Sequence, residues 1–249
     1  MYLGNHQALI TGERQKVTDS DTALDMVRET RFLINRVDDW IFEEISPYLG
    51  QRVLEVGCGL GNLLSRLAGR EKVVGLDTDF ASVSRLKATY GSHAGMEVVQ
   101  ADIADESVLA LRDYGFDTIV CLNVLEHIEH DEVALANMRA LLKLNGHLLL
   151  VVPAHSWLYG SMDAAIGHYR RYETGGLQAK LASAGFQLTA SKYLNTFGAL
   201  GWWFNGRVLR RPVPPSDQLR LFNHVVPAVR AIEGWINPRL GISLLVVAQ

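Results

Sequence analysis

The sequence of 249 residues has few cysteines, no excess of basic residues and no apolar run long enough to span a membrane. Its two cysteines, Cys58 and Cys121, lie far apart, so a disulfide framework is not expected and a reducing, cytoplasmic compartment is. The formal net charge of −3 gives no electrostatic case for a nucleic-acid partner. Residues 1–17 show no signal-peptide pattern, and no run reaches the about 20 apolar residues of a transmembrane segment.

What the sequence does contain is a glycine-rich stretch over 53–61, Val-Leu-Glu-Val-Gly-Cys-Gly-Leu-Gly. It predicts a strand, a glycine turn and the start of a helix over 62–67, where backbone N–H groups can face a ligand. Asp77 ends the next apolar run, 72–76, and an acid there can accept both hydroxyls of a ribose. The dinucleotide fingerprint has two residues between its second and third glycines, but this stretch has one. Glu55, two residues before the first glycine, suits a cationic amino-acid end better than a pyrophosphate.

Strands and helices alternate along the chain, which predicts right-handed βαβ units and a mostly parallel sheet with its ligands at the carboxyl ends of the strands. Residues 1–20 are polar, and a helix is expected over 22–45, ended by Pro47. After residue 153 a polar loop precedes a helix that Gly185 ends. The expected strands are 52–56, 72–76, 96–100, 116–122, 147–152, 186–193 and 242–248, and the expected helices are 80–90, 131–144 (ended by Asn145-Gly146), 174–184 and two helices within 194–240, separated by prolines 212–215.

With Gly57, Gly59 and Gly61 preceded by Glu55 and followed by Asp77, the chain resembles the class I S-adenosylmethionine (SAM)-dependent methyltransferases, whose first motif is acid-x-Gly-x-Gly-x-Gly. The resemblance covers roughly residues 45–190. It implies a Rossmann-like three-layer α/β sandwich with a seven-stranded sheet and a reversed last strand, SAM as cofactor and S-adenosylhomocysteine as product. A glycine turn without a ligand is the alternative. The cofactor contacts it implies are Glu55, Gly57, Cys58, Gly59, Gly61, Asp77, Thr78, Asp102, Ile103 and Asn123.

The resemblance also divides the single domain into parts. They are an N-terminal arm and helix (1–45), a cofactor-binding core (46–193), a helical insertion (194–240) and the last strand (241–249). The N-terminal helix covers the cofactor or shapes the acceptor pocket, or else it packs on the sheet edge. The insertion, with Trp202 near its start, is a lid over a hydrophobic acceptor, an amphipathic surface that touches a membrane, or a pair of helices packed on the core.

The resemblance implies roles for residues that follow the ends of the third and fourth expected strands. Asp102 accepts the adenine amino group, with Ile103 against the ring, unless Asp102 caps the following segment instead. Asn123 lies beside the methionine part of the cofactor, where its amide can both donate and accept. His127 takes a proton from the acceptor, since its ordinary pKa of about 6.5 suits neutral pH, or else it ties a helix start to a loop.

A metal site is a further alternative at the same place. In ubiquinone-pathway O-methyltransferases and small-RNA 2′-O-methyltransferases, Glu-x-x-Glu-His and a later histidine bind a divalent metal. Glu126 and His127 match, and His155 or His168 could supply the later ligand, but Asn123 replaces the first acid. Because losing a carboxylate weakens a site for a hard cation, no metal is expected, and Glu126, His127 and His168 are the candidate ligands if one binds.

The loop over 160–172 carries the expected acceptor contacts. Arg170 and Arg171 could clamp a carboxylate or phosphate, and His168 is a second candidate base. Tyr159 and Tyr169 are further candidate contacts, together with Trp202. The alternative is a surface loop with salt bridges.

The predicted reaction is therefore methyl transfer from SAM to oxygen or nitrogen, rather than carbon, of a small acceptor that is anionic or partly hydrophobic. A nucleic-acid or protein methyltransferase is one alternative, although the composition offers no basic groove or tail. A SAM-binding protein without activity is another. The sequence does not distinguish a monomer from a homodimer.

Overall fold

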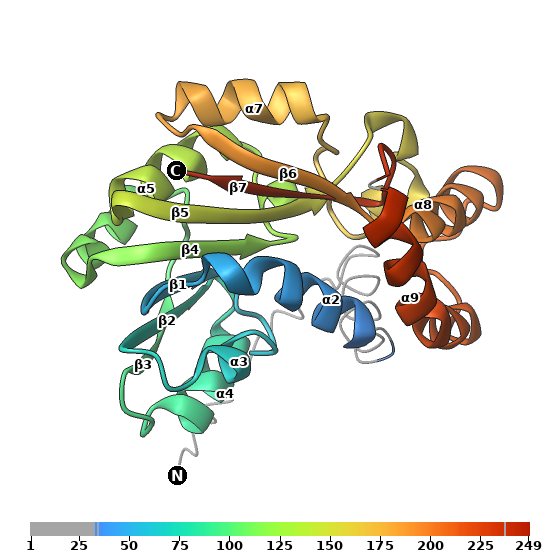
Figure 1. The fold of residues 1–249 in the computed structure, drawn as a ribbon. Coiled ribbons are helices and arrows are strands. Elements are labelled where there is room, and N and C mark those ends of the chain that lie inside the picture. Colours follow the sequence, from blue (N-terminus) through green and yellow to red (C-terminus); the bar gives the residue numbers. More distant parts are fainter. Residues whose placement is uncertain (1–32, 34, 237) are drawn as a thin grey trace, which may run out of the picture.

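The computed structural model describes residue 33, residues 35–236 and residues 238–249 (Figure 1). The expected polar arm and the first part of the helix predicted over 22–45 lie outside the described residues. The described part of that helix is α2 (Asn35–Ile45), and the turn η2 (Ser46–Tyr48) follows it with Pro47 in its first positions. The predicted end of this helix is thereby confirmed.

A seven-stranded sheet in the order β3-β2-β1-β4-β5-β7-β6 forms the centre of the molecule (Figure 1). All neighbours pair in parallel except β7, which is antiparallel to both β5 and β6. The predicted Rossmann-like sheet with a reversed last strand is confirmed. The strands are β1 (Arg52–Val56), β2 (Lys72–Asp77), β3 (Met96–Gln100), β4 (Phe116–Leu122), β5 (Leu142–Pro153), β6 (Leu188–Leu194) and β7 (Ser243–Ala248).

Helices cover both faces of the sheet, because its inner strands are apolar on both sides. Leu54 and Val56 of β1 belong to one buried cluster, and Val53, which precedes them, belongs to the cluster on the other face. The first cluster includes side chains of η3 (Glu106–Tyr114), α5 (Asp131–Leu141) and α7 (Thr174–Ser183), and the second those of α2, α3 (Leu64–Leu67), α4 (Phe80–Tyr90) and α9 (Ser216–Ile236). Shorter elements at the carboxyl side of the sheet are η4 (Leu125–His127), η5 (Ser156–Leu158), α6 (Ser161–Ala165), α8 (Thr196–Trp203) and the π-helical turn η6 (Phe204–Val208).

The predicted boundaries of the helix over 131–144 and of the strand over 147–152 are wrong. The helix expected to run to Leu144 and to end at Asn145-Gly146 instead ends at Leu141, and β5 begins at once with Leu142 paired to Phe116. The register of β4 and β5 then shifts between this pair and the next, Thr118 with His147. Asn145, with a φ of 62°, lies in that irregular segment, since asparagine tolerates the left-handed region.

The insertion consists of two helical segments, as predicted. The segment α8–η6 and the helix α9 lie side by side and antiparallel, because hydrogen bonds join them at both ends. Thr196 N–H donates to Glu233 Oε1 at 2.7 Å, and Asn205 Nδ2 donates to Gln218 Oε1 at 3.0 Å. Within the described part of the chain, no helix has both the length and the hydrophobicity that crossing a membrane requires.

A buried acid at the start of α5 ties this helix to α7 and to the loop before it. Asp131 accepts from Lys180 Nζ at 2.8 Å, from Tyr172 Oη at 2.8 Å and from Arg170 Nη1 at 2.9 Å. Burial alone would raise the pKa of Asp131, but hydrogen bonds from Lys180, Tyr172 and Arg170 hold its pKa at about 2.

Asp131→Asn should therefore lower the free energy of unfolding above pH ~4, where the carboxyl group of the unfolded chain is ionised. A pKa that is lowered in the folded state adds stability, and this stability is lost as the pH falls toward 2. The difference in free energy of unfolding between wild type and variant, the gap, should therefore narrow between pH ~4 and pH 2. Denaturant titrations at several pH values measure the gap, with the exposed acid substitution Asp113→Asn as the control. A gap that does not change with pH would contradict the assignment.

Candidate active site

A cavity of about 980 Å³ opens at the carboxyl ends of β1, β2, β4 and β5, where a parallel sheet of this kind binds its ligands. Most of the predicted site residues line it: Glu55, Gly57, Cys58, Gly59, Asp77, Thr78, Asp102, Ile103, Asn123, His127, His168, Arg171 and Trp202. Gly61 lies behind the loop, where a Cβ would meet Leu86 Cδ2 at 2.5 Å. Tyr159, Tyr169 and Arg170 are also outside the lining.

The glycine loop uses its backbone donors internally, which corrects one prediction. The N–H groups of Gly57 and Cys58 donate to Leu76 O at 2.7 and 3.0 Å, and that of Gly59 donates to Asp77 Oδ2 at 2.7 Å. The loop folds back tightly over the end of β2, so these groups do not face a ligand. Gly57 has a φ of 75°, and a Cβ there would lie 2.3 Å from Val124 Cγ2, so the turn requires glycine.

Carboxylates, in place of N–H donors, set the electrostatics of this end of the cavity. Glu55, Asp77 and Asp102 all line it, and Glu55 is buried. Burial, together with the charges of Glu55 and Asp77, raises the pKa of the Cys58 thiol to about 12. A negative field of this kind favours a cationic ligand and opposes a pyrophosphate. The residues present therefore fit SAM, which carries sulfonium and ammonium cations.

Asp77 and Asp102 are held by backbone N–H groups. Asp77 Oδ1 accepts from Asp79 N–H at 2.9 Å, and Asp77 Oδ2 accepts from Gly59 N–H. A carboxylate can accept about four hydrogen bonds, so about two positions remain for the hydroxyl groups of a ribose. Asp102 Oδ1 accepts from Ala104 N–H at 2.8 Å within a local turn, whereas Asp105 and not Asp102 caps the helical turn η3 that follows.

Asn137 of α5 supports the turn that carries Asp102 and Ile103, and it was not predicted. It is buried, and its Nδ2 donates to Ile103 O at 2.8 Å. This bond fixes the turn that carries Ile103 into the cavity wall. On the sequence Asn137 is an ordinary polar residue within a helix, and only the packing of α5 against η3 shows its use.

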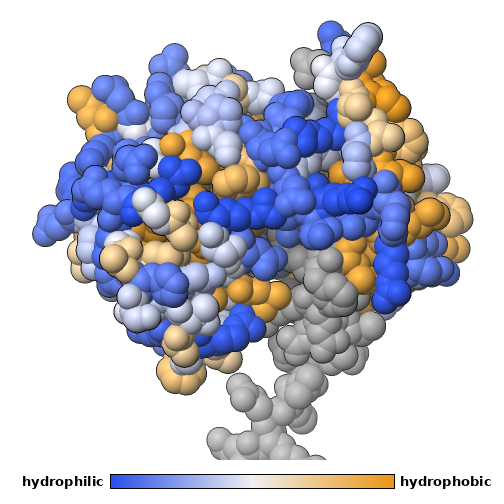
Figure 2. Space-filling view, turned by 60° about the horizontal axis from the view of Figure 1, so that its bottom comes forward, coloured by the Kyte–Doolittle hydropathy of each residue, from blue (hydrophilic) through white to orange (hydrophobic). Residues whose placement is uncertain are grey.

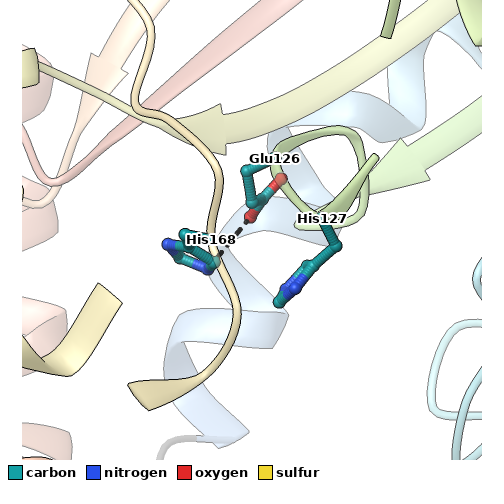
Figure 3. Close-up of side chains that lie close together, drawn as sticks. All are labelled: Glu126, His127 and His168. Carbon is teal, nitrogen blue, oxygen red and sulfur yellow. Dashed lines mark ion pairs between the residues drawn. The ribbon is translucent and has the colours of Figure 1, made fainter. Parts of the chain in front are cut away.

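Glu126, His127 and His168 meet at the other end of the cavity (Figure 3). Glu126 and His127 come from η4 and His168 from the loop after α6, and one side-chain atom of each lies within 4.8 Å of the others. Glu126 Oε1 is 3.7 Å from His168 Nε2, and the two imidazole rings meet edge to face at 4.7 Å. Glu126 is fully buried and His168 nearly so, while His127 is half-buried.

Asp163, which the sequence analysis missed, holds this end of the cavity together. Its fully buried carboxylate accepts from His168 Nδ1 at 2.9 Å and from Arg171 Nε at 2.7 Å through Oδ1. Through Oδ2 it accepts from Trp202 Nε1 and Gly160 N–H, both at 3.0 Å. Burial alone would raise the pKa of Asp163, but the hydrogen bond from His168 and the charge of Arg171 lower it.

The ionised Asp163 sets the tautomer of His168. An ionised carboxylate can only accept, so His168 Nδ1 must carry a proton. In the neutral imidazole the lone pair is then on Nε2, the nitrogen closest to Glu126. This nitrogen can take a proton from a molecule in the cavity.

Both arginines of the loop are paired, so the predicted clamp of two available guanidinium groups does not form in this structure. Arg171 is buried and also donates from Nη1 to Ala154 O at 3.0 Å. Arg170 bonds Glu129 O at 2.7 Å and Asp131, away from the cavity. The reason is electrostatic, because a guanidinium group inside the protein needs a carboxylate partner.

The two tyrosines act on the same loop. Tyr159 Oη donates to His168 O at 2.8 Å, and the N–H of Tyr169 donates to Glu126 O at 2.9 Å. The ring of Tyr169 is exposed. Both contacts fix the loop that carries His168 against the turn that carries Glu126.

Two imidazoles and a carboxylate are also a ligand set that a transition-metal ion accepts. Glu126, His127 and His168 could hold one, whereas His155 cannot join them. It lies outside the cavity lining, stacked on Tyr193 at 4.7 Å with Nδ1 3.3 Å from Glu173 Oε2. The expectation of no metal stays a prediction.

Comparison with known proteins identifies the family. Residues 28–205 match the family model described as a methyltransferase domain, so the chain belongs to this family. Membership confirms the predicted class, a SAM-dependent methyltransferase with SAM as its cofactor.

Individual relatives match over shorter stretches. A ubiquinone biosynthesis O-methyltransferase of Ralstonia nicotianae is 32% identical over 112 residues, 44% of this chain and 46% of that protein. A tRNA U34 carboxymethyltransferase of Shewanella sediminis is 28% identical over 164 residues, 59% of this chain and 48% of that protein. The chain thus spans about half the length of these curated relatives. The structure of an S-adenosylmethionine-dependent methyltransferase from Mesorhizobium loti aligns with a TM-score of 0.57 at 15% identity, over 83% of this chain and 96% of that one, which shows the shared fold.

Proposed function

We propose that this protein transfers the methyl group of SAM to a hydroxyl oxygen of a small, partly apolar acceptor. One observation carries the proposal. A single cavity joins the acids Glu55, Asp77 and Asp102 at one end to the His168 imidazole at the other. Apolar side chains from α2, α6, α8, α9 and neighbouring loops also line this cavity, among them Val37, Ile41, Leu63, Ile128, Met162, Phe197, Leu219 and Phe222.

The cofactor is assigned to the end with the three acids. Glu55 lies near enough to the glycine turn to offset the cationic amino-acid part, Asp77 accepts from the ribose hydroxyls, and Asp102 with Ile103 holds the adenine. Asn123 borders the passage between the two ends. When bound, the cofactor supplies a methyl group already activated by the sulfonium charge, so the protein must align the acceptor and remove one proton.

His168 is assigned as the group that takes this proton, at Nε2. Asp163 on the opposite nitrogen stabilises the imidazolium that forms, as a carboxylate does beside other histidine bases. Glu126, at 3.7 Å, favours the same charged form. His127, at the half-buried side of the cluster, is the alternative base.

The chemical class of the acceptor follows from whether the positively charged side chains in the cavity wall are already neutralised by a partner. Among the described residues, two guanidinium groups lie in the cavity wall, those of Arg66 and Arg171. Each is paired with a carboxylate, Asp39 and Asp163 respectively. A neutral acceptor with an apolar part therefore suits this cavity better than the anionic acceptor expected from the arginines. The relative named as a ubiquinone biosynthesis O-methyltransferase supports oxygen as the atom methylated.

The test is turnover with SAM that carries a labelled methyl group. Phenols and alcohols with attached alkyl or prenyl chains should become labelled, and chain length should improve kcat/KM. Amines and carboxylates of the same size are the matched comparison set. Labelling of these alone, or of none of the compounds while SAM still binds, would contradict the proposal.

RNA is the second candidate acceptor, because one relative is named as a tRNA carboxymethyltransferase. The same assay with unmodified tRNA decides it. A proposal of small-molecule methylation expects no label in the tRNA.

The expectation of no metal is tested in the same assay. Dialysis against a chelator should leave turnover within twofold of the untreated enzyme, since His168 needs no metal to act as a base. Loss of activity that zinc or another divalent ion restores would instead assign Glu126, His127 and His168 as metal ligands.

Asp77→Ala should weaken SAM binding by about 1.5–3 kcal/mol, the range for hydrogen bonds to a charged group. It removes the acceptor of the ribose hydroxyls and also the bond that orders Gly59. Calorimetric titration measures the effect, and Asp105→Ala, an acid that caps η3 outside the cavity lining, is the control. An unchanged dissociation constant in a folded variant would refute the role.

A further inference from the structure

The first helical segment of the insertion exposes an apolar stripe. Phe197, Leu200, Phe204 and Val208 follow one another at spacings of three and four residues along α8–η6, and 47–61% of each is exposed. Their spacing puts them on one side of the segment. The opposite side holds buried residues such as Ala199 and Gly206, so the stripe is not the side that packs on the core.

Helix α9 exposes a second stripe beside the first. Leu221, Val225, Ile232 and Trp235 recur at helical spacing, with exposed fractions of 69, 43, 53 and 93%. The residues that bury α9 are Val226, Val229 and Glu233, a quarter-turn to a third of a turn away. Packing of α9 on the core therefore does not explain why the four residues of this second stripe are apolar. We call the eight residues of the two stripes the apolar surface.

Charge distinguishes this part of the chain from the rest. The insertion, residues 194–240, has six arginines, no lysine and two acids, a formal charge of +4, so the remainder of the chain carries −7 to reach its total of −3. Arg207, Arg210, Arg220 and Arg239 are exposed. Of the two acids, Glu233 is buried and accepts N–H groups at the start of α8, which leaves Asp217 as the exposed one.

We propose that the apolar surface and its four exposed arginines bind the surface of a bilayer that contains anionic lipids. Hydrophobic residues gather along the right-hand edge of the molecule in Figure 2, the side on which Figure 1 places α8 and α9. Aromatic and aliphatic side chains would enter the headgroup region, and guanidinium groups would bind lipid phosphates. The charge of +4 on the insertion complements anionic headgroups, and the charge of −7 on the rest of the chain would turn the insertion toward such a membrane.

The apolar surface adjoins the cavity, so binding to a membrane would bring the cavity close to molecules dissolved in the bilayer. Phe197 belongs both to the apolar surface and to the cavity lining, and Leu219 and Phe222 of α9 also line the cavity. An apolar acceptor dissolved in the bilayer would thus meet the cavity at the membrane. This access to an acceptor rests on the proposed function, whereas membrane binding itself does not.

Sedimentation of the full chain with lipid vesicles tests the proposal. The protein should sediment with vesicles of phosphatidylcholine and phosphatidylglycerol in equal parts, more weakly with phosphatidylcholine alone, and less as salt rises. Leu221→Glu with Trp235→Glu should lower the vesicle affinity at least tenfold, and Arg220→Gln with Arg239→Gln about 25-fold, at about fivefold for each arginine. Leu144→Glu, at a site 82% exposed at the start of β5, is the matched control and should change nothing.

Three outcomes would overturn the proposal. The first is no sedimentation with either vesicle. The second is equal loss of binding in the Leu144 control. The third is a dimer by light scattering that Leu221→Glu with Trp235→Glu makes monomeric while vesicle binding is absent, which would assign the surface to a second copy. SAM calorimetry on each variant separates these results from failure of the proposed function, because vesicle binding requires no turnover.

Discussion

His168→Ala should lower kcat by about 10²–10⁴-fold, the usual contribution of a positioned general base, and leave the affinity for SAM unchanged. The side chain lies at the acceptor end of the cavity, with Nε2 toward the cluster and Nδ1 on Asp163. Its loss removes the proton acceptor without touching Glu55, Asp77 or Asp102. Initial rates with a labelled methyl group and SAM calorimetry provide the two measurements.

The pH profile separates a base from a structural histidine. Turnover of the wild type should fall at acid pH as an imidazole becomes protonated, and His168→Ala should lose this limb. His127→Ala is the matched control from the same cluster and should retain it. If the His127 variant lost the limb and the His168 variant kept it, the roles of the two histidines would be exchanged.

Asp163→Asn should lower the free energy of unfolding by about 3–5 kcal/mol, the cost of removing one partner from a buried ion pair. The variant leaves the buried Arg171 guanidinium without a counter-charge, and an amide cannot accept as many hydrogen bonds as the carboxylate does. Denaturant unfolding followed by circular dichroism measures the change.

A double variant separates the effect of the buried ion pair on stability from the effect of Asp163 on the position of His168. Asp163→Leu with Arg171→Met removes both charges and should recover part of the lost stability, because apolar residues replace buried ion pairs well. The recovery is partial because His168, Trp202 and Gly160 still lose their acceptor. Turnover should stay low, because His168 still lacks its partner on Nδ1. Recovery of both stability and turnover would show that Asp163 has no part in positioning His168.

The sheet could be predicted because each strand is marked by a pattern of neighbouring residues in the sequence. Each inner strand is a short apolar run ended by a polar or glycine residue, as 52–56 before Gly57 shows, and a parallel sheet is buried on both faces. The cofactor acids followed from the same logic, since Asp77 and Asp102 come at or just after strand ends. The helix end at Leu141 was missed because a long-range pairing, Leu142 with Phe116, overrides the local Asn-Gly signal.

The acceptor end could not be derived in this way, because its contacts depend on which distant residues meet. Nothing in the sequence marks Asp163 apart from its place in a Gly-x-x-Asp spacing, a weak sign of a helix start. Its partners are His168, Arg171 and Trp202, up to 39 residues away. The two arginines looked available for an acceptor, but the fold provides each with a carboxylate.

The bond between Trp202 and Asp163 has a consequence for changing the acceptor by protein engineering. Trp202 belongs to the insertion, and its indole N–H occupies the same carboxylate that orients His168. An insertion taken from another methyltransferase and joined at residues 194 and 240 would remove this donor along with the acceptor wall. Such a chimera would lose rate for every acceptor, and its catalytic defect would be mistaken for a change of specificity. Libraries that keep Trp202 and vary Phe197, Leu219 and Phe222 would change the cavity wall and leave the histidine in place.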